Sequence, residues 1–126
     1  MLIIDDSRPM RRLLSHFARQ LQFETVEACD GKEALELLIR SDPREPFDVA
    51  LVDWEMPRMN GLEFVVAVRR NEEFVNLKLM MVTTQNAISR VAEALHAGAD
   101  DFLMKPVTEE LFMEKLQILG LADSAP

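Results

Sequence analysis

Residues 49–53, Val49-Ala50-Leu51-Val52-Asp53, form an apolar run that ends in a carboxylate. A short run without alternating polar residues is typical of a strand covered on both faces, as in a parallel sheet beneath helices. The chain contains four further short runs: Leu2–Ile4, Thr25–Ala28, Leu79–Val82 and Phe102–Met104. Thr25–Ala28 is the most polar of them. We therefore expect five strands, with residues 49–52 as the central one.

The segments between these runs have helical spacing, because their apolar residues recur on one face of a helix. The stripes lie at Met10–Leu21, Ala34–Leu38, Ile88–Leu95 and Leu111–Leu119. The segment Leu62–Arg70 is apolar on more than one side and is also expected to be a helix. Pro9 suits a first helical turn, Gly98 a left-handed C-cap and Thr108 an N-cap. Strand and helix thus alternate five times, which predicts an α/β fold with right-handed crossovers.

The composition limits what kind of protein this is. A chain of 126 residues predicts one domain, which we assign to residues 1–121 with a short tail at 122–126. The net charge of −8 argues against binding to nucleic acid or to an anionic membrane. One cysteine excludes an internal disulfide and a multi-cysteine zinc site. With neither a signal peptide nor an apolar run of roughly 18 residues, the expected protein is a monomeric cytoplasmic domain.

The residues that follow the predicted strands carry the polar chemistry. Functional groups in an open parallel sheet gather at the carboxyl ends of its strands. At these positions the sequence has Asp5 with Asp6, Asp53, Thr83 with Thr84, and Lys105 with Pro106. Three carboxylates held together repel one another unless a cation neutralises them. Hard oxygen ligands of this kind suit Mg²⁺.

A metal ion, an ammonium group and a hydroxyl donor together can hold the oxygens of a phosphoryl group. A carboxylate in such a site can itself attack phosphorus and form an aspartyl phosphate. Asp53 is the best candidate for this nucleophile, because its strand lies between the acidic pair and Lys105. The sequence thus predicts a Mg²⁺-assisted phosphoacceptor site.

Together these motifs resemble those of response-regulator receiver domains. The matching elements are Asp5-Asp6-Ser7, Asp53-Trp54-Glu55-Met56-Pro57 with Gly61, Thr83-Thr84, Ala97-Gly98-Ala99 and Lys105-Pro106. They stand in the family's order and near its spacings, and the resemblance covers essentially the whole chain. It implies the (βα)5 flavodoxin-like (CheY-like) fold, a five-stranded parallel sheet of order 2-1-3-4-5 with helices on both faces.

The resemblance also implies roles for the acidic residues. Asp53 accepts the phosphoryl group from the phosphohistidine of a histidine kinase. Mg²⁺ is held directly by Asp6, mainly through a bound water by Asp5, and by Asp53 itself. Glu55 contributes its backbone carbonyl to the same ion, so its side chain matters less there.

Further implied roles concern the switch. Thr83 turns inward to one phosphoryl oxygen, and Lys105, before a cis peptide bond to Pro106, pairs with another. Phe102 takes the place of the aromatic residue that moves inward on activation. The surface formed by the fourth helix, the fifth strand and the fifth helix then binds a downstream protein. Such a domain is not an enzyme beyond its own phosphotransfer and slow autodephosphorylation.

Within the family, the sequence is most similar to standalone chemotaxis-type members. Met10-Arg11-Arg12 comes soon after the acidic pair, Trp54 follows Asp53 directly, and the chain stops soon after the last predicted helix. The expected target is the flagellar motor switch, with a phosphorelay shuttle as the alternative. Glu55 and Gln85 differ from the residues common in the best-known chemotaxis members. Both flank the path of the water that hydrolyses the aspartyl phosphate, and therefore bear on the rate of that step.

Two other classes remain open on the residues alone. A small Mg²⁺-dependent phosphatase of haloacid-dehalogenase type also uses an aspartyl nucleophile, but it needs an Asp-x-Asp motif where this chain has adjacent aspartates. An interaction module would keep the fold without the chemistry, and the complete set of acidic, threonine and lysine residues argues against it.

Outside the site, Cys29 is expected to be a small buried hydrophobe. Arg8, Arg11, Arg12 and Arg19 are expected to form a solvated helix face. For the first three of these arginines the alternative is a docking surface for an acidic donor domain.

Overall fold

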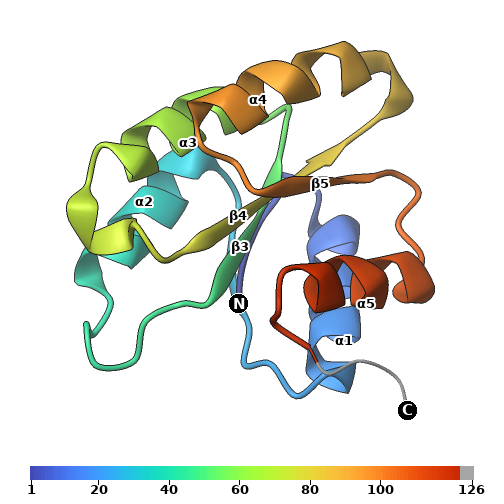
Figure 1. Ribbon diagram of the computed structural model, residues 1–126, viewed down its shortest axis with the longest axis horizontal. Helices are drawn as coiled ribbons and strands as arrows, with labels where there is room; N and C mark the ends of the chain where they lie inside the picture. The colour runs from blue at the N-terminus through green and yellow to red at the C-terminus, as the bar shows by residue number, and fades with distance from the viewer. Residues whose placement is uncertain (123–126) are drawn as a thin grey trace.

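The computed structural model describes residues 1–122, which form a five-stranded parallel sheet with helices on both faces (Figure 1). The strand order is β2-β1-β3-β4-β5, so the predicted fold class is confirmed. The strands are β1 (Leu2–Ile4), β2 (Val26–Ala28), β3 (Val49–Asp53), β4 (Lys78–Thr83) and β5 (Asp101–Met104). The α-helices within residues 1–122 are α1 (Arg8–Gln20), α2 (Gly31–Arg40), α3 (Gly61–Arg69), α4 (Val91–Ala97) and α5 (Glu109–Ile118), and the 3₁₀ helices there are η1 (Glu72–Phe74) and η2 (Gln85–Arg90). Of the predicted tail at 122–126, residues 123–126 lie outside the described residues.

The central strands are buried on both faces because their apolar residues alternate between two hydrophobic clusters. In β3, Ala50 and Val52 belong to a cluster with residues of α2, α3 and α4. Val49 and Leu51 belong to a second cluster with residues of α1 and α5. Figure 1 shows these two groups of helices on opposite sides of the sheet. Full burial of a valine or leucine side chain stabilises the fold by about 1.5–3 kcal/mol, so the unbroken run at residues 49–52 fixes β3 at the centre.

The helix ends follow the capping residues expected from the sequence. Pro9 lies in the first turn of α1, and Gly98 ends α4 with a φ of 126°, in the left-handed region. Thr108 accepts a hydrogen bond from the backbone N–H of Leu111 at 3.2 Å and caps α5. These boundaries keep the helices short. Within residues 1–122, none is long and apolar enough to cross a bilayer.

The fourth helical segment differs from the prediction. The apolar stripe at Ile88–Leu95 begins in the 3₁₀ helix η2, and only Val91–Ala97 is α-helical. The buried positions are Ala87, Val91 and Ala94, whereas Leu95 is 40% exposed. A 3₁₀ helix has three residues per turn, so the face it buries differs from the one that α-helical spacing predicts.

The register of the sheet gathers the polar residues at one edge. The last residue of β1 is paired with the residue before Asp53, so Asp5 and Asp53 emerge beside each other. Thr83 ends β4 next to β5, and its carbonyl accepts the backbone N–H of Lys105 at 2.7 Å. The carboxyl ends of four strands therefore present one continuous polar rim, as open parallel sheets generally do.

Candidate functional site

Asp53 ends the central strand β3 and is buried. Its Oδ1 accepts a hydrogen bond from the Lys105 Nζ at 3.2 Å. Burial, followed by the negative charge of Asp5, raises the pKa of Asp53 from 3.8 to about 6, although Lys105 acts in the opposite direction. The carboxylate is therefore more basic than an ordinary aspartate, and one ammonium group compensates its charge only in part.

Lys105 directly follows β5 and lies between two carboxylates. Its Nζ is 3.2 Å from Asp53 Oδ1 and 3.5 Å from Asp5 Oδ2. Burial by itself lowers the pKa of Lys105, but the charges of Asp53 and Asp5 outweigh it and raise this pKa above its usual value. The peptide bond between Lys105 and Pro106 is cis, as the resemblance implied.

Asp5, Asp6 and Asp53 form an acidic cluster in which one carboxylate oxygen of each lies within 4.8 Å of the others. Asp6 is exposed, whereas Asp5 is fully buried. Asp5 Oδ1 accepts the Ser7 N–H at 2.8 Å, but the buried Asp5 Oδ2 accepts no hydrogen bond from any residue in 1–122. Burial is the main cause that raises the pKa of Asp5. Three converging carboxylates, two of which share the single ammonium group of Lys105, fit a hard divalent cation such as Mg²⁺, which would neutralise their repulsion.

A cavity of about 240 Å³ opens over these groups. Its lining comprises Asp6, Asp53, Trp54, Glu55, Thr84, Ala87 and Lys105. Glu55 and Thr84 are exposed, so they border the space in which a small anion would meet Asp53. A larger cavity, of about 360 Å³, lies between η1 and the loop that precedes β3, at the opposite edge of the sheet from the acidic cluster.

The two residues expected to act as a switch lie outside the acidic cluster. Thr83 is buried, and its hydroxyl donates to the carbonyl of Thr84 at 3.3 Å. Phe102 is half-buried in β5, with the Lys115 ammonium 4.8 Å from the centre of its ring. Lys115 in turn donates to Asp101 Oδ1 at 2.9 Å. The structure thus brings Lys105 to the carboxylates, but it leaves the Thr83 hydroxyl engaged elsewhere.

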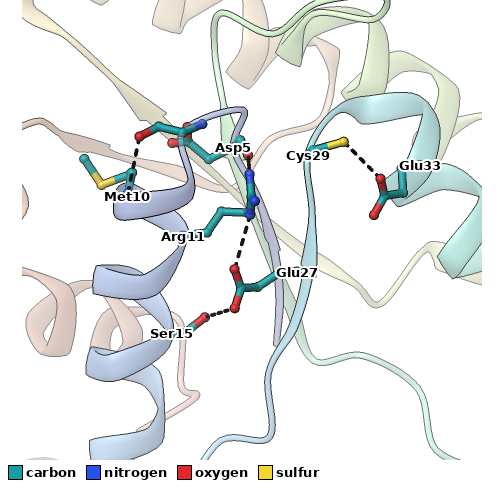
Figure 2. A network of polar contacts seen from close by, with 8 residues as sticks. Asp5, Met10, Arg11, Ser15, Glu27, Cys29 and Glu33 are labelled. Carbon is teal, nitrogen blue, oxygen red and sulfur yellow. Dashed lines mark hydrogen bonds and ion pairs between the residues drawn. The ribbon is translucent and has the colours of Figure 1, made fainter.

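Arg11 lies at this edge of the sheet, where the sequence predicted a solvated residue. Its side chain is only 16% exposed, and its Nη1 donates to the backbone carbonyl of Asp5 at 2.6 Å (Figure 2). A signal for this burial existed in the sequence. Arg11 shares the i, i+3, i+4, i+7 face of α1 with the buried residues Leu14, Ser15 and Ala18.

A second arginine holds the loop that follows β3. Arg58 has a φ of 66°, and its guanidinium forms an ion pair with the buried carboxylate of Asp30, the N-cap of α2. The two residues are 28 positions apart, so no local pattern predicts the pair. It ties the loop that carries Glu55 to the start of α2.

Cys29 is exposed, which contradicts the prediction that it is buried. Its Sγ donates to Glu33 Oε2 at 3.0 Å (Figure 2). This hydrogen bond to Glu33 is the largest of the effects that raise the pKa of the Cys29 thiol. The thiol lies just past the end of β2, between the buried residues Ala28 and Asp30, so the chain stays in the core here and only the side chain of Cys29 points outward.

The arrangement is suited to accept a phosphoryl group, because a buried basic carboxylate stands beside an ammonium group and a potential cation site. The family model of the response regulator receiver domain matches residues 1–117. The chain belongs to this family. Receiver domains are signalling proteins rather than enzymes, and a histidine kinase supplies their phosphoryl group. The acidic cluster Asp5, Asp6 and Asp53 is typical of the receiver magnesium site.

Similar proteins include standalone relatives of similar length. The chemotaxis protein CheY1 of Helicobacter pylori is 38% identical over 125 residues, which cover 98% of each chain. The chemotaxis protein CheY of Pseudomonas aeruginosa is 37% identical over 117 residues, covering 92% of this chain and 91% of that protein. The crystallised chemotaxis response regulator CheY4 of Vibrio cholerae has a TM-score of 0.84 at 34% identity, covering 94% of this chain and 95% of that one.

Proposed function

We propose that this receiver domain is a chemotaxis-type response regulator that accepts a phosphoryl group on Asp53. The observation that carries the proposal is the position of Asp53 within the acidic cluster. Asp53 is buried and also lines the cavity, whereas Asp6 is exposed and Asp5 does not belong to the lining. Of the three carboxylates, Asp53 therefore combines raised basicity with access to a donor.

The transfer forms one bond and breaks another. A carboxylate oxygen of Asp53 forms a P–O bond while the P–N bond of the donor phosphohistidine breaks, and the departing imidazole takes a proton from solvent. Lys105, within 3.5 Å of both Asp53 and Asp5, pairs with one phosphoryl oxygen. The Thr83 hydroxyl leaves the Thr84 carbonyl and donates to another phosphoryl oxygen.

In this proposal Asp6, Asp53 and the backbone carbonyl of Glu55 would hold Mg²⁺ directly, and Asp5 would hold it mainly through a bound water. The bound ion supplies positive charge to the phosphoryl oxygens. Asp5 Oδ2 supports this assignment. This buried anionic oxygen accepts no hydrogen bond within residues 1–122, and it shares the Lys105 ammonium, 3.5 Å away, with Asp53, so a further cation would stabilise it.

The signal leaves through the surface formed by α4, β5 and α5. Movement of Thr83 toward the phosphoryl group opens space into which Phe102 of β5 turns. The displaced ring changes what this surface presents to a protein partner. Two features support the proposal: Phe102 is only half-buried in its present position, and Leu95 of α4 is 40% exposed.

The proposed process is control of motility in the cytoplasm, by a monomer that binds the flagellar motor switch. Its support is that relatives covering nearly the whole chain are named chemotaxis proteins. A phosphorelay shuttle is the alternative output within the same family. Binding of the phosphorylated protein to a motor switch protein, rather than transfer of its phosphoryl group to a histidine phosphotransfer domain, would distinguish the two.

Intact-protein mass spectrometry tests the chemistry directly. The protein is incubated with Mg²⁺ and acetyl phosphate, and Asp53→Asn serves as the control. The expected result is the gain of one phosphoryl group, absent from Asp53→Asn and absent when EDTA replaces Mg²⁺. Equal phosphorylation of Asp53→Asn would contradict the assignment of the acceptor.

A further inference from the structure

We infer that Arg11 is a positioning residue for the cation site, since it fixes the backbone of the loop that carries Asp5 and Asp6. The inference rests on the proposed function, because it concerns Mg²⁺ binding by the acidic cluster. It extends that proposal to a side chain which lies on α1 and contributes no ligand of its own. Figure 2 shows Arg11 reaching from α1 toward Asp5 on one side and Glu27 on the other.

Asp5 is fixed through three of its polar groups, and each is held by a different part of the chain. Its backbone N–H donates to the carbonyl of Ala28 in β2 at 3.1 Å. Its Oδ1 accepts the N–H of Ser7 at 2.8 Å. Its backbone carbonyl accepts Arg11 Nη1 at 2.6 Å. These contacts leave Oδ2, which lies 3.5 Å from the Lys105 Nζ and accepts no hydrogen bond within residues 1–122, as the oxygen of Asp5 that is available to a cation.

Arg11 is itself held in place. Its Nε donates to Glu27 Oε1 at 3.2 Å, and the other oxygen of Glu27 accepts the hydroxyl of the buried Ser15 at 3.4 Å. The guanidinium is planar and rigid, so its Nε binds Glu27 of β2 while its Nη1 binds the backbone carbonyl of Asp5, directly after β1. A lysine ammonium has no such planar group and cannot reproduce both contacts in one fixed geometry.

Charge alone predicts the opposite effect from positioning. A positive side chain near the acidic cluster repels Mg²⁺, so loss of Arg11 would tighten Mg²⁺ binding if only its charge mattered. Joint removal of Arg11 and Glu27 leaves the net charge unchanged. Weaker Mg²⁺ binding by such a variant therefore reports a loss of geometry.

Isothermal titration calorimetry with MgCl₂ provides the test, with the emission of Trp54 as a second readout. Trp54 suits this purpose because it is the single tryptophan and lines the cavity beside Asp53. The first variant combines Arg11→Met with Glu27→Gln; it removes the contacts of Arg11 with Asp5 and Glu27 and is called the clamp variant. The second variant is Arg11→Lys, which keeps the charge. The matched control is Arg44→Met with Asp42→Asn, since Arg44 and Asp42 form an exposed ion pair in the loop between α2 and β3.

We expect the clamp variant to bind Mg²⁺ about tenfold more weakly, as is typical when a residue that orients a metal ligand is removed. Arg11→Lys should weaken binding by a smaller factor, and the control should bind as the unsubstituted protein does. Thermal unfolding of each variant verifies that it is folded, and Arg11→Lys serves as the test if the double variant is not.

Unchanged or tighter Mg²⁺ binding by a folded clamp variant and by Arg11→Lys would overturn the role of Arg11 while leaving the cation site intact. Absence of Mg²⁺ binding by the unsubstituted protein is a different result. It would overturn the proposed cation site and the role of Arg11 with it.

Discussion

Replacing Asp53 with asparagine is expected to stabilise the folded protein when divalent cations are absent. Burial and then the charge of Asp5 raise the pKa of Asp53 from 3.8 to about 6, so the ionised carboxylate opposes folding. A difference of about two pKa units corresponds to roughly 3 kcal/mol of unfolding free energy. Water in the cavity that Asp53 lines screens part of this repulsion, and we expect a gain of about 1–2 kcal/mol.

The pH dependence of this gain follows from the same shift. Between pH 3.8 and about 6 the folded protein binds the Asp53 proton more tightly than the unfolded chain does. The free energy of unfolding therefore falls as the pH rises through this window. Asparagine has no proton to release, so the advantage of Asp53→Asn is full above pH about 6 and disappears below pH about 4.

Urea unfolding followed by circular dichroism, in EDTA and at several pH values, measures the gain. Asp42→Asn is the matched control, because a hydrogen bond from Arg44 lowers the pKa of the exposed Asp42 carboxyl, and loss of this carboxylate should not stabilise the fold. Mg²⁺ should reverse the order, since a cation at about 100 times its Kd stabilises the protein that binds it by about 2.7 kcal/mol. An Asp53→Asn protein no more stable than the unsubstituted one, in EDTA at neutral pH, would refute the reasoning.

Three further substitutions test other contacts. Gly61→Ala places a Cβ 2.7 Å from the Asp53 carbonyl oxygen and should lower the free energy of unfolding by about 1–3 kcal/mol in urea titrations; an unchanged value would contradict this. Glu33→Gln removes the main cause of the raised pKa of Cys29, so iodoacetamide should alkylate the thiol faster at mildly alkaline pH; an equal rate would argue against that cause. Arg69→Met removes hydrogen bonds to three backbone carbonyls and one carboxylate and should cost about 2–4 kcal/mol in the same titrations, whereas a loss below about 1 kcal/mol would show that water replaces them.

The parts of the fold that the sequence predicts are those that depend on local pattern. The run at residues 49–52 is buried on both faces because successive side chains in a strand point to opposite sides. The residue after such a run lies at the carboxyl edge whatever the details of packing. For this reason the positions of Asp5, Asp53 and Lys105 follow from the strands that precede them, together with the parallel topology.

The parts that sequence does not predict depend on how elements rotate and approach one another. The pair of Arg58 and Asp30 joins two loops that no periodic pattern relates. The burial of Arg11 follows from its position on the buried face of α1, not from its polarity. A charged side chain can be buried when it has partners, and Arg11 has Glu27. The buried residues of the α4 segment differ from those that helical spacing predicts, because the 3₁₀ helix η2 precedes α4.

The central claim is that the acceptor is the carboxylate of Asp53. Borohydride reduces an aspartyl acyl phosphate to homoserine, and it leaves free carboxylates unchanged. The measurement is peptide mass mapping of the protein after acetyl phosphate, Mg²⁺ and borohydride. We predict homoserine at position 53, with Asp5 and Asp6 unmodified. Homoserine at position 5 or 6, or a phosphorylated protein in which residue 53 remains aspartate, would contradict the claim.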